Sequence, residues 1–170
     1  MRDRISISRV KLLHPAIASE AETIIDEIEA GFPANIAVRI VQGLRTFEEQ
    51  DALYQQGRTI PGNKVTNAHA GSSYHNYGLA LDFAVLYDKD KNGTFEELSW
   101  NRVKDGDVDG VPDWTEIAGA FIKHGYNWGG NFRSFPDFPH VEKNFGHTWR
   151  QLFIKYNNKD FIPGSKYVRL

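Results

Sequence analysis

The sequence predicts one globular domain that contains both α-helices and β-strands. Its 170 residues are 41% hydrophobic and 25% charged, a length and composition typical of a domain with a single core. Apolar residues follow helical spacing in some segments and alternate, or run without interruption, in others. No internal repeat, low-complexity tract or linker divides the chain, so we expect residues 1–170 to form a single domain.

The first predicted elements are a helix and a strand. Residues 15–29 carry apolar side chains at helical spacing, with a proline in the first turn and Gly31 just past the end. This pattern indicates a helix packed by one face. Residues 36–41 are rich in β-branched side chains and stop before Gly43, which predicts a strand that ends there.

A second helix follows this strand. Thr46 and Glu49 form a capping box, and the helix that they begin is predicted to run to Gln56. Gln50 lies on the apolar face of this helix, where a glutamine is ordinarily partly exposed or hydrogen-bonded to the backbone. The alternative is that Gln50 and Arg45 face one pocket.

A long loop leads to a predicted strand with a buried carboxylate. Residues 57–74 hold Gly, Pro, Asn and Ser throughout and show no periodicity, and loops of this length are usually functional. The loop ends at His75. Residues 79–87 predict a strand buried on both faces and interrupted by Asp82. A buried Asp is costly unless it is paired, hydrogen-bonded or metal-bound.

The second half of the chain predicts two further helices. Residues 88–116 are acidic and turn-rich, and residues 114–124 return to helical spacing. We expect residues 126–146, which contain several glycines and prolines, to be irregular. A capping box at Thr148 then begins a last short helix that reaches Tyr156.

The composition excludes several classes of protein. Lys and Arg total 20 and Asp and Glu total 22, so the formal net charge is −2 and no basic excess favours nucleic acid as a partner. Cysteine is absent, which excludes thiol nucleophiles, thiolate metal sites and disulfides. The sequence shows neither a signal-peptide apolar stretch nor a membrane span of roughly 18 apolar residues. We therefore expect synthesis in the cytoplasm without a signal peptide, and no membrane insertion.

Two short segments hold residue types that bind metals. Residues 73–82 read S-x-H-x(2)-G-x-A-x-D and supply His75 and Asp82. Residues 137–142, DFPHVE, supply His140. Two histidines and one carboxylate leave an open position for water on Zn²⁺, as hydrolytic zinc sites require. Taken separately, each segment has a simpler interpretation: a hydrogen-bonded histidine in the first, and a solvent-exposed turn in the second.

These segments, together with GLRTFEEQDALYQQGRT and VTNA, closely resemble the peptidoglycan L-alanyl-D-glutamate endopeptidases. These bacterial and phage endolysin enzymes belong to the D-Ala-D-Ala metallopeptidase group. The similarity runs from about Leu12 to Leu152. It implies an α+β fold of the hedgehog and D-Ala-D-Ala peptidase type, with helices packed on a small, mainly antiparallel sheet. It also implies zinc-dependent hydrolysis of the L-Ala to D-Glu bond of the stem peptide.

Carried over position by position, the resemblance also implies roles for single residues. His75, Asp82 and His140 would bind zinc, and Asp137 would be the general base. The zinc-polarised water would lose its proton to this carboxylate, which would pass the proton to the leaving amine.

The resemblance implies a substrate-binding role for three further residues. Arg45 would contact the substrate carbonyl or carboxylate, and Gln50 and Ser73 would line the same cleft. One departure from the family pattern is Val141-Glu142, where an aromatic residue is expected after the histidine. This departure removes no chemical group.

Two alternatives to the endopeptidase remain open at this stage. One is a D-Ala-D-Ala carboxypeptidase or dipeptidase that uses the same zinc site, and the other is a non-catalytic, calcium-stabilised binding module. For the endopeptidase we expect a monomer that acts on the bacterial cell wall, with the peptidoglycan stem peptide as its partner and without a separate cell-wall-binding domain.

A third segment predicts a calcium site. Residues 105–116, DGDVDGVPDWTE, match the twelve-residue calcium-loop pattern. The short 98–104 stretch would have to serve as the helix before this loop. The alternative is an acidic turn before a helix, where carboxylates favour the N-terminal dipole. The candidate calcium ligands are Asp105, Asp107, Asp109, Val111, Asp113 and Glu116.

Overall fold

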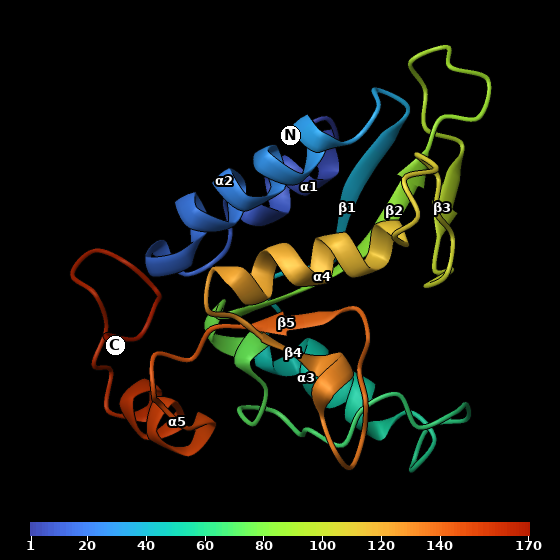
Figure 1. Cartoon of the computed structure of the whole chain (residues 1–170). Helices are drawn as coiled ribbons and strands as arrows, with labels where there is room; N and C mark the ends of the chain where they lie inside the picture. Colours follow the sequence, from blue (N-terminus) through green and yellow to red (C-terminus); the bar gives the residue numbers. More distant parts are fainter.

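The computed structural model describes residues 1–170 and shows five α-helices packed with one five-stranded sheet (Figure 1). The helices are α1 (Arg4–Val10), α2 (Pro15–Gly31), α3 (Phe47–Gln55), α4 (Asp113–Lys123) and α5 (Trp149–Asn157). The strands are β1 (Ile36–Gln42), β2 (Ala80–Tyr87), β3 (Glu97–Ser99), β4 (Asn127–Trp128) and β5 (His140–Glu142). Two short 3₁₀ helices, η1 (Tyr74–Tyr77) and η2 (Gly129–Asn131), complete the elements.

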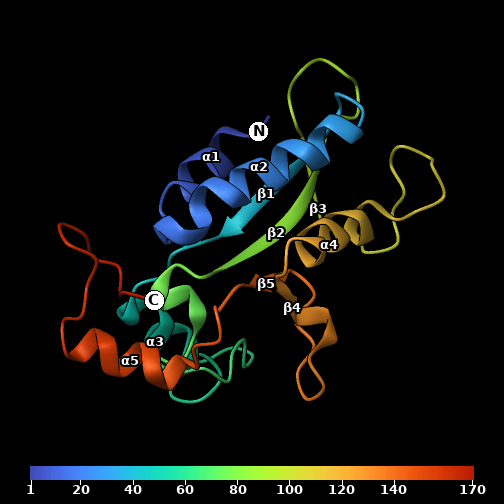
Figure 2. The same cartoon turned by 60° about the vertical axis from the view of Figure 1, so that its left-hand side comes forward.

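The sheet is antiparallel at every pairing, in the order β1-β2-β5-β4, and β3 also pairs with β2. The long strand β2 lies at its centre. Helix α2 contacts both α1 and α4, and all three helices contact the sheet (Figures 1 and 2). The expected α+β fold with a small antiparallel sheet is therefore confirmed. No helix has the length and apolar character needed to cross a membrane.

The central strand β2 is buried along almost its whole length, as its apolar sequence predicts. Its two faces carry Leu81, Phe83 and Val85 on one side and Ala80 and Ala84 on the other, all fully buried. Asp82 is the one half-buried position of the strand. The only carboxylate of β2 thus points to a place that the hydrophobic core does not fill.

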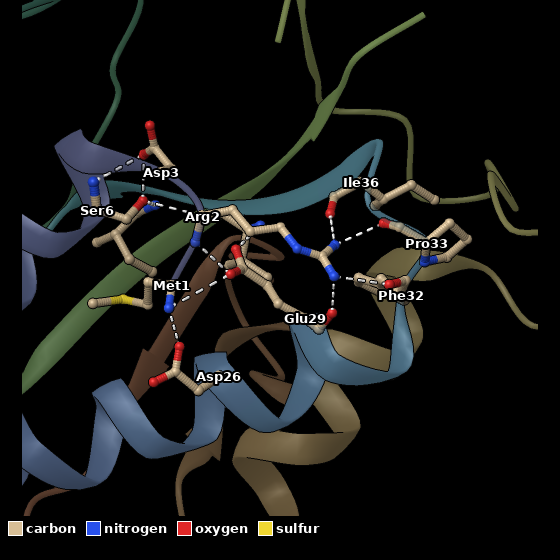
Figure 3. Close-up of polar contacts among 11 residues, drawn as sticks. Met1, Arg2, Asp3, Ser6, Asp26, Glu29, Phe32, Pro33 and Ile36 are labelled. Carbon is tan, nitrogen blue, oxygen red and sulfur yellow. Dashed lines mark hydrogen bonds and ion pairs between the residues drawn. The ribbon is translucent and has the colours of Figure 1, made fainter. Parts of the chain in front are cut away.

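The N-terminal segment ties α2 to β1 (Figure 3). The Arg2 guanidinium donates hydrogen bonds to the carbonyls of Glu29, Phe32, Pro33 and Ile36, where α2 ends and β1 begins. These include carbonyls that a helix end leaves without partners, and a cation there is favourable for the helix dipole. The buried Glu29 carboxylate in turn accepts from the backbone N–H groups of Arg2, at 2.6 Å, and of β1.

One expectation from the sequence requires correction, and the structure adds one element. Helix α1 lies in a segment for which the sequence predicts no element. The 126–146 segment contains β4, η2 and β5, and is therefore not wholly irregular. Before the acidic loop, residues 97–99 form strand β3 and residues 100–104 form no helix, so the loop has no helix in front of it. Strands of two or three residues show no alternation that a sequence pattern reveals. Here β3 and β5 pair with β2, and β4 in turn pairs with β5.

Candidate active site

The three candidate metal ligands come from three elements that meet at one end of the sheet. His75 lies in η1, and Gly78, at a φ of 69°, ends η1 in the left-handed conformation before the chain enters β2. Asp82 of β2 lies directly opposite His140 of β5 in the antiparallel register. The sheet itself therefore sets the separation of two of the three ligands.

The three side chains point their donor atoms at one another. The Asp82 Oδ1 atom lies 3.2 Å from His75 Nε2 and 3.1 Å from His140 Nδ1, and the two ring nitrogens are 3.1 Å apart. Two imidazole nitrogens and one carboxylate oxygen that converge in this way form a donor set that suits Zn²⁺. The residues present thus fit the metal that the sequence implied.

The remaining ring nitrogens of the two histidines have acceptors outside the cluster. His75 Nδ1 lies 2.8 Å from the carbonyl oxygen of Gly43, the residue just after β1. Because a carbonyl only accepts, Nδ1 carries the proton and Nε2 keeps its lone pair for a metal. His140 Nε2 lies 3.0 Å from Glu142 Oε2.

The charges of the cluster show how strongly it attracts a cation. Burial alone would raise the pKa of Asp82, but His75 and the hydrogen bonds from both imidazoles hold this pKa well below its usual range. Burial would lower the pKa of His140, whereas hydrogen bonds to Asp82 and Glu142 raise it to about 10. Without a metal, the cluster therefore binds a proton tightly, and a divalent cation would compete for the same lone pair.

Arg45 lies beside the cluster and is held by Gln50. The Arg45 Nη1 atom donates to Gln50 Oε1 at 2.9 Å, and Gln50 Nε2 donates to the carbonyl of Ala68 at 2.7 Å. Arg45 Nη2 lies 3.6 Å from Asp82 Oδ2. The prediction that Gln50 lines the cleft is wrong, because its side chain is 0% exposed. Gln50 lies on the apolar, inward-facing side of α3 and holds Arg45 in place from the interior of the protein.

A cleft of about 560 Å³ opens over these groups. Arg45, Ser73 and Asp137 line it together with the three candidate ligands. Burial and the charge of Asp82 raise the pKa of the Asp137 carboxyl. The cleft therefore brings together the predicted zinc ligands, the predicted base and a fixed positive charge, while Gln50 alone among the residues predicted for the catalytic cleft stays outside it.

The loop that carries Asp137 is held by two tryptophans and by the close approach of a glycine. The indole N–H groups of Trp114 and Trp128 both donate to the carbonyl of Phe138, at 3.3 Å and 2.7 Å. The Asp137 N–H donates to the carbonyl of Gly129 at 2.9 Å. A side chain at Gly129 would place its Cβ 2.3 Å from the Asp137 carbonyl oxygen, so only glycine fits there.

The acidic loop gathers its carboxylates in two overlapping groups. One group is Asp105, Asp107 and Asp113, and the other is Asp107, Asp109 and Glu116. Asp105 accepts from the backbone N–H groups of Val108 and Gly110. One buried carboxylate oxygen of Asp107 and one of Glu116 have no hydrogen-bond partner. The side chain of Val111 is exposed to solvent.

Comparison with known proteins identifies the family. The chain is 42% identical over 130 residues to the peptidoglycan L-alanyl-D-glutamate endopeptidase CwlK of Bacillus subtilis, covering 76% of this chain and 72% of that protein. The chain belongs to the peptidoglycan L-alanyl-D-glutamate endopeptidase family. The resemblance seen in the sequence is therefore confirmed.

Two further comparisons concern the segment that carries the cluster and the fold. A family model described as D-alanyl-D-alanine carboxypeptidase matches residues 66–143, a range that contains His75, Asp82, Asp137 and His140. The crystal structure of the L-Ala D-Glu endopeptidase ChiX of Serratia marcescens matches 84% of this chain and 88% of that chain, at a TM-score of 0.56 and 17% identity. This second match supports the fold.

Proposed function

We propose that the protein is a zinc-dependent peptidase that hydrolyses the L-Ala to D-Glu bond of peptidoglycan stem peptides. The observation that carries the proposal is the convergence of His75, Asp82 and His140 in one cleft with Asp137 and Arg45. The 42% identity to CwlK, a named L-alanyl-D-glutamate endopeptidase, supports the choice of bond.

Each group of the cleft then has a chemical task. His75 Nε2, Asp82 Oδ1 and His140 Nδ1 would hold the metal. Bound zinc polarises a carbonyl and brings the pKa of a zinc-bound water down to about 7. Asp137 accepts a proton from the attacking water and passes it to the amine nitrogen of D-Glu as the peptide bond breaks.

Arg45 supplies the fixed positive charge of the cleft. Its planar guanidinium suits two parallel hydrogen bonds to a carboxylate, such as the free α-carboxylate of a γ-linked D-Glu, or to the developing oxyanion. Gln50 holds the guanidinium in place before substrate arrives, so little ordering is left for the moment of binding. Ser73 lines the same cleft and offers a hydroxyl to the substrate backbone.

A second candidate function is cleavage of the D-Ala-D-Ala end of the stem peptide, which the description of the matching family model favours. Digestion of purified muropeptides, followed by mass spectrometry, separates the candidates. New N-terminal D-Glu on the released peptides supports the endopeptidase. Released D-Ala supports the carboxypeptidase, and intact muropeptides with zinc-loaded protein would support a non-catalytic binding module.

We further propose that the acidic loop of residues 105–116 binds Ca²⁺. Oxygen ligands from Asp105, Asp107, Asp109, Asp113 and Glu116, with the backbone of Val111, match the ligand chemistry of this ion. The buried oxygens of Asp107 and Glu116 that lack a partner support the proposal, because an unpaired buried carboxylate is costly. Isothermal titration with Ca²⁺ tests it, and Asp107→Asn should weaken the binding. The absence of both heat and a thermal shift in the wild type would contradict it.

We also propose that residues 1–170 act as one catalytic domain and as a monomer on the cell wall. One cluster of 26 buried hydrophobic residues, contributed by every layer of the fold, supports the single domain. Light scattering coupled to size-exclusion chromatography should give the 19.3 kDa of a monomer. A mass of twice this value would contradict the monomer.

A further inference from the structure

We propose that Glu142 is a positioning residue that fixes the tautomer of His140, so that His140 presents Nδ1 to the metal. The inference rests on the proposed zinc function and names a residue that the mechanism above does not use. It follows from the strand that carries both residues, from a hydrogen bond and from the burial of the two side chains.

The strand geometry places Glu142 beside His140. The two residues are at positions i and i+2 of β5, so their side chains leave the same face of the sheet. On the neighbouring strand β2, Asp82 is opposite His140 and Ala80 is opposite Glu142. The small side chain of Ala80 leaves room for the Glu142 carboxylate to turn toward the imidazole.

The hydrogen bond decides which nitrogen of His140 carries the proton. Glu142 Oε2 lies 3.0 Å from His140 Nε2. An ionised carboxylate only accepts hydrogen bonds, so Nε2 must be the N–H, and a neutral imidazole then has its lone pair on Nδ1. The Nδ1 atom is the one that faces Asp82 Oδ1, at 3.1 Å.

The two histidine ligands are thus fixed in opposite ways. In His75 the backbone carbonyl of Gly43 takes the Nδ1 proton and leaves Nε2 for the metal, whereas in His140 the Glu142 carboxylate takes the Nε2 proton. A carboxylate acceptor also makes the imidazole a more basic ligand than a carbonyl does. With only 13% of the Glu142 side chain and 9% of the His140 side chain exposed, water screens this contact poorly.

The test compares zinc affinity in variants of the whole chain. Glu142→Ala removes the acceptor and Glu142→Gln keeps its size and a neutral acceptor, while Glu22→Gln, on the exposed face of α2, is the matched control. Competition with a chromogenic chelator measures the zinc Kd. Loss of such a partner typically weakens metal binding by about 10- to 100-fold, so we expect that loss for Glu142→Ala, a smaller loss for Glu142→Gln and none for the control.

A second readout reports the tautomer itself. In zinc-loaded protein with ¹⁵N-labelled histidine, we expect a slowly exchanging Nε2–H signal from His140 that Glu142→Ala loses. Wild-type zinc affinity in folded Glu142→Ala or, if that variant does not fold, in Glu142→Gln would overturn the inference, as would an Nδ1–H signal from His140.

The zinc measurement also separates this inference from the proposed function. If the wild-type protein binds zinc but leaves muropeptides intact, the proposed endopeptidase function is contradicted. The role of Glu142 is then decided by the zinc Kd values of the wild type and the Glu142 variants. If the wild-type protein cleaves muropeptides but Glu142→Ala leaves the zinc affinity unchanged, only the inference about Glu142 is contradicted. A raised KM at unchanged zinc affinity would assign Glu142 to substrate contact and would overturn the positioning role.

Discussion

The His75–Asp82–His140 cluster and the acidic loop of residues 105–116 are both groups of potential ligands, but they are built differently. The three ligands of the cluster come from η1, β2 and β5, and two of them are a cross-strand pair. The ligands of the loop come from one continuous stretch of chain, in which Asp113 and Glu116 already belong to the first turn of α4. The first arrangement joins three elements that are distant in the sequence, and the second is one acidic stretch that runs into the start of α4.

The electrostatics of the two groups differ in the same way. The imidazoles keep the Asp82 pKa well below its usual range. In the loop, burial and the charges of four neighbouring aspartates raise the pKa of Glu116 to about 7. The cluster is therefore assembled and neutralised before any metal arrives, whereas the loop contains mutual repulsion that only a cation or a proton relieves. This difference predicts a catalytic role for the cluster and a stabilising role for the loop.

The largest effect is expected on removing a ligand from the cluster. His75→Ala should abolish stoichiometric zinc binding and lower the turnover of stem peptides by about 10³-fold or more, because the chemistry of the metal is lost. His124→Ala, at a surface contact with Glu27, is the matched control. Metal analysis and turnover measured on the same samples check this prediction. Full turnover by His75→Ala without bound zinc would contradict the catalytic role of the cluster.

A smaller effect is expected at Arg45. Arg45→Lys keeps the charge but loses the planar pair of donors and the bond to Gln50, so we expect turnover to fall by about 10²-fold with zinc content unchanged. Arg4→Lys, on the exposed face of α1, is the control. Steady-state kinetics on a defined muropeptide measure the effect. If both lysine variants behave like the wild type, Arg45 does not act on the substrate.

The smallest effect on activity, and one mainly on stability, is expected at the acidic loop. The pKa of Glu116 is about 7 in the folded chain and near 4.5 ordinarily, so the folded state binds the proton more tightly. Stability without calcium should therefore fall as the pH rises from about 4.5 through 7. Calcium at about 100 times its Kd should add about 2.7 kcal/mol.

Thermal unfolding at two pH values checks the calcium prediction. The shift in Tm caused by Ca²⁺ should be larger at pH 8, where the carboxylates are charged, than at pH 5, and Asp107→Asn should reduce it. An equal shift at both pH values, or a shift that survives Asp107→Asn, would mean that calcium acts elsewhere.

Much of the fold and of the cluster was predictable because its signals are local. The strand that carries Asp82 and the capping box of α3 are patterns of neighbouring residues. Gln50 was assigned wrongly because its burial depends on Ala68 in the long loop. The partners of the Asp137 loop, Trp114 and Trp128, act through contacts over 24 and 10 residues that no periodicity marks.

The most direct test of the account is to measure zinc content and turnover together in Asp137→Asn. Asp137 lines the cleft but is not one of the three ligands, so the account predicts one zinc per chain with turnover lower by about 10²- to 10⁴-fold, the usual range for general acid–base catalysis. Near wild-type turnover by this zinc-loaded variant would contradict the account.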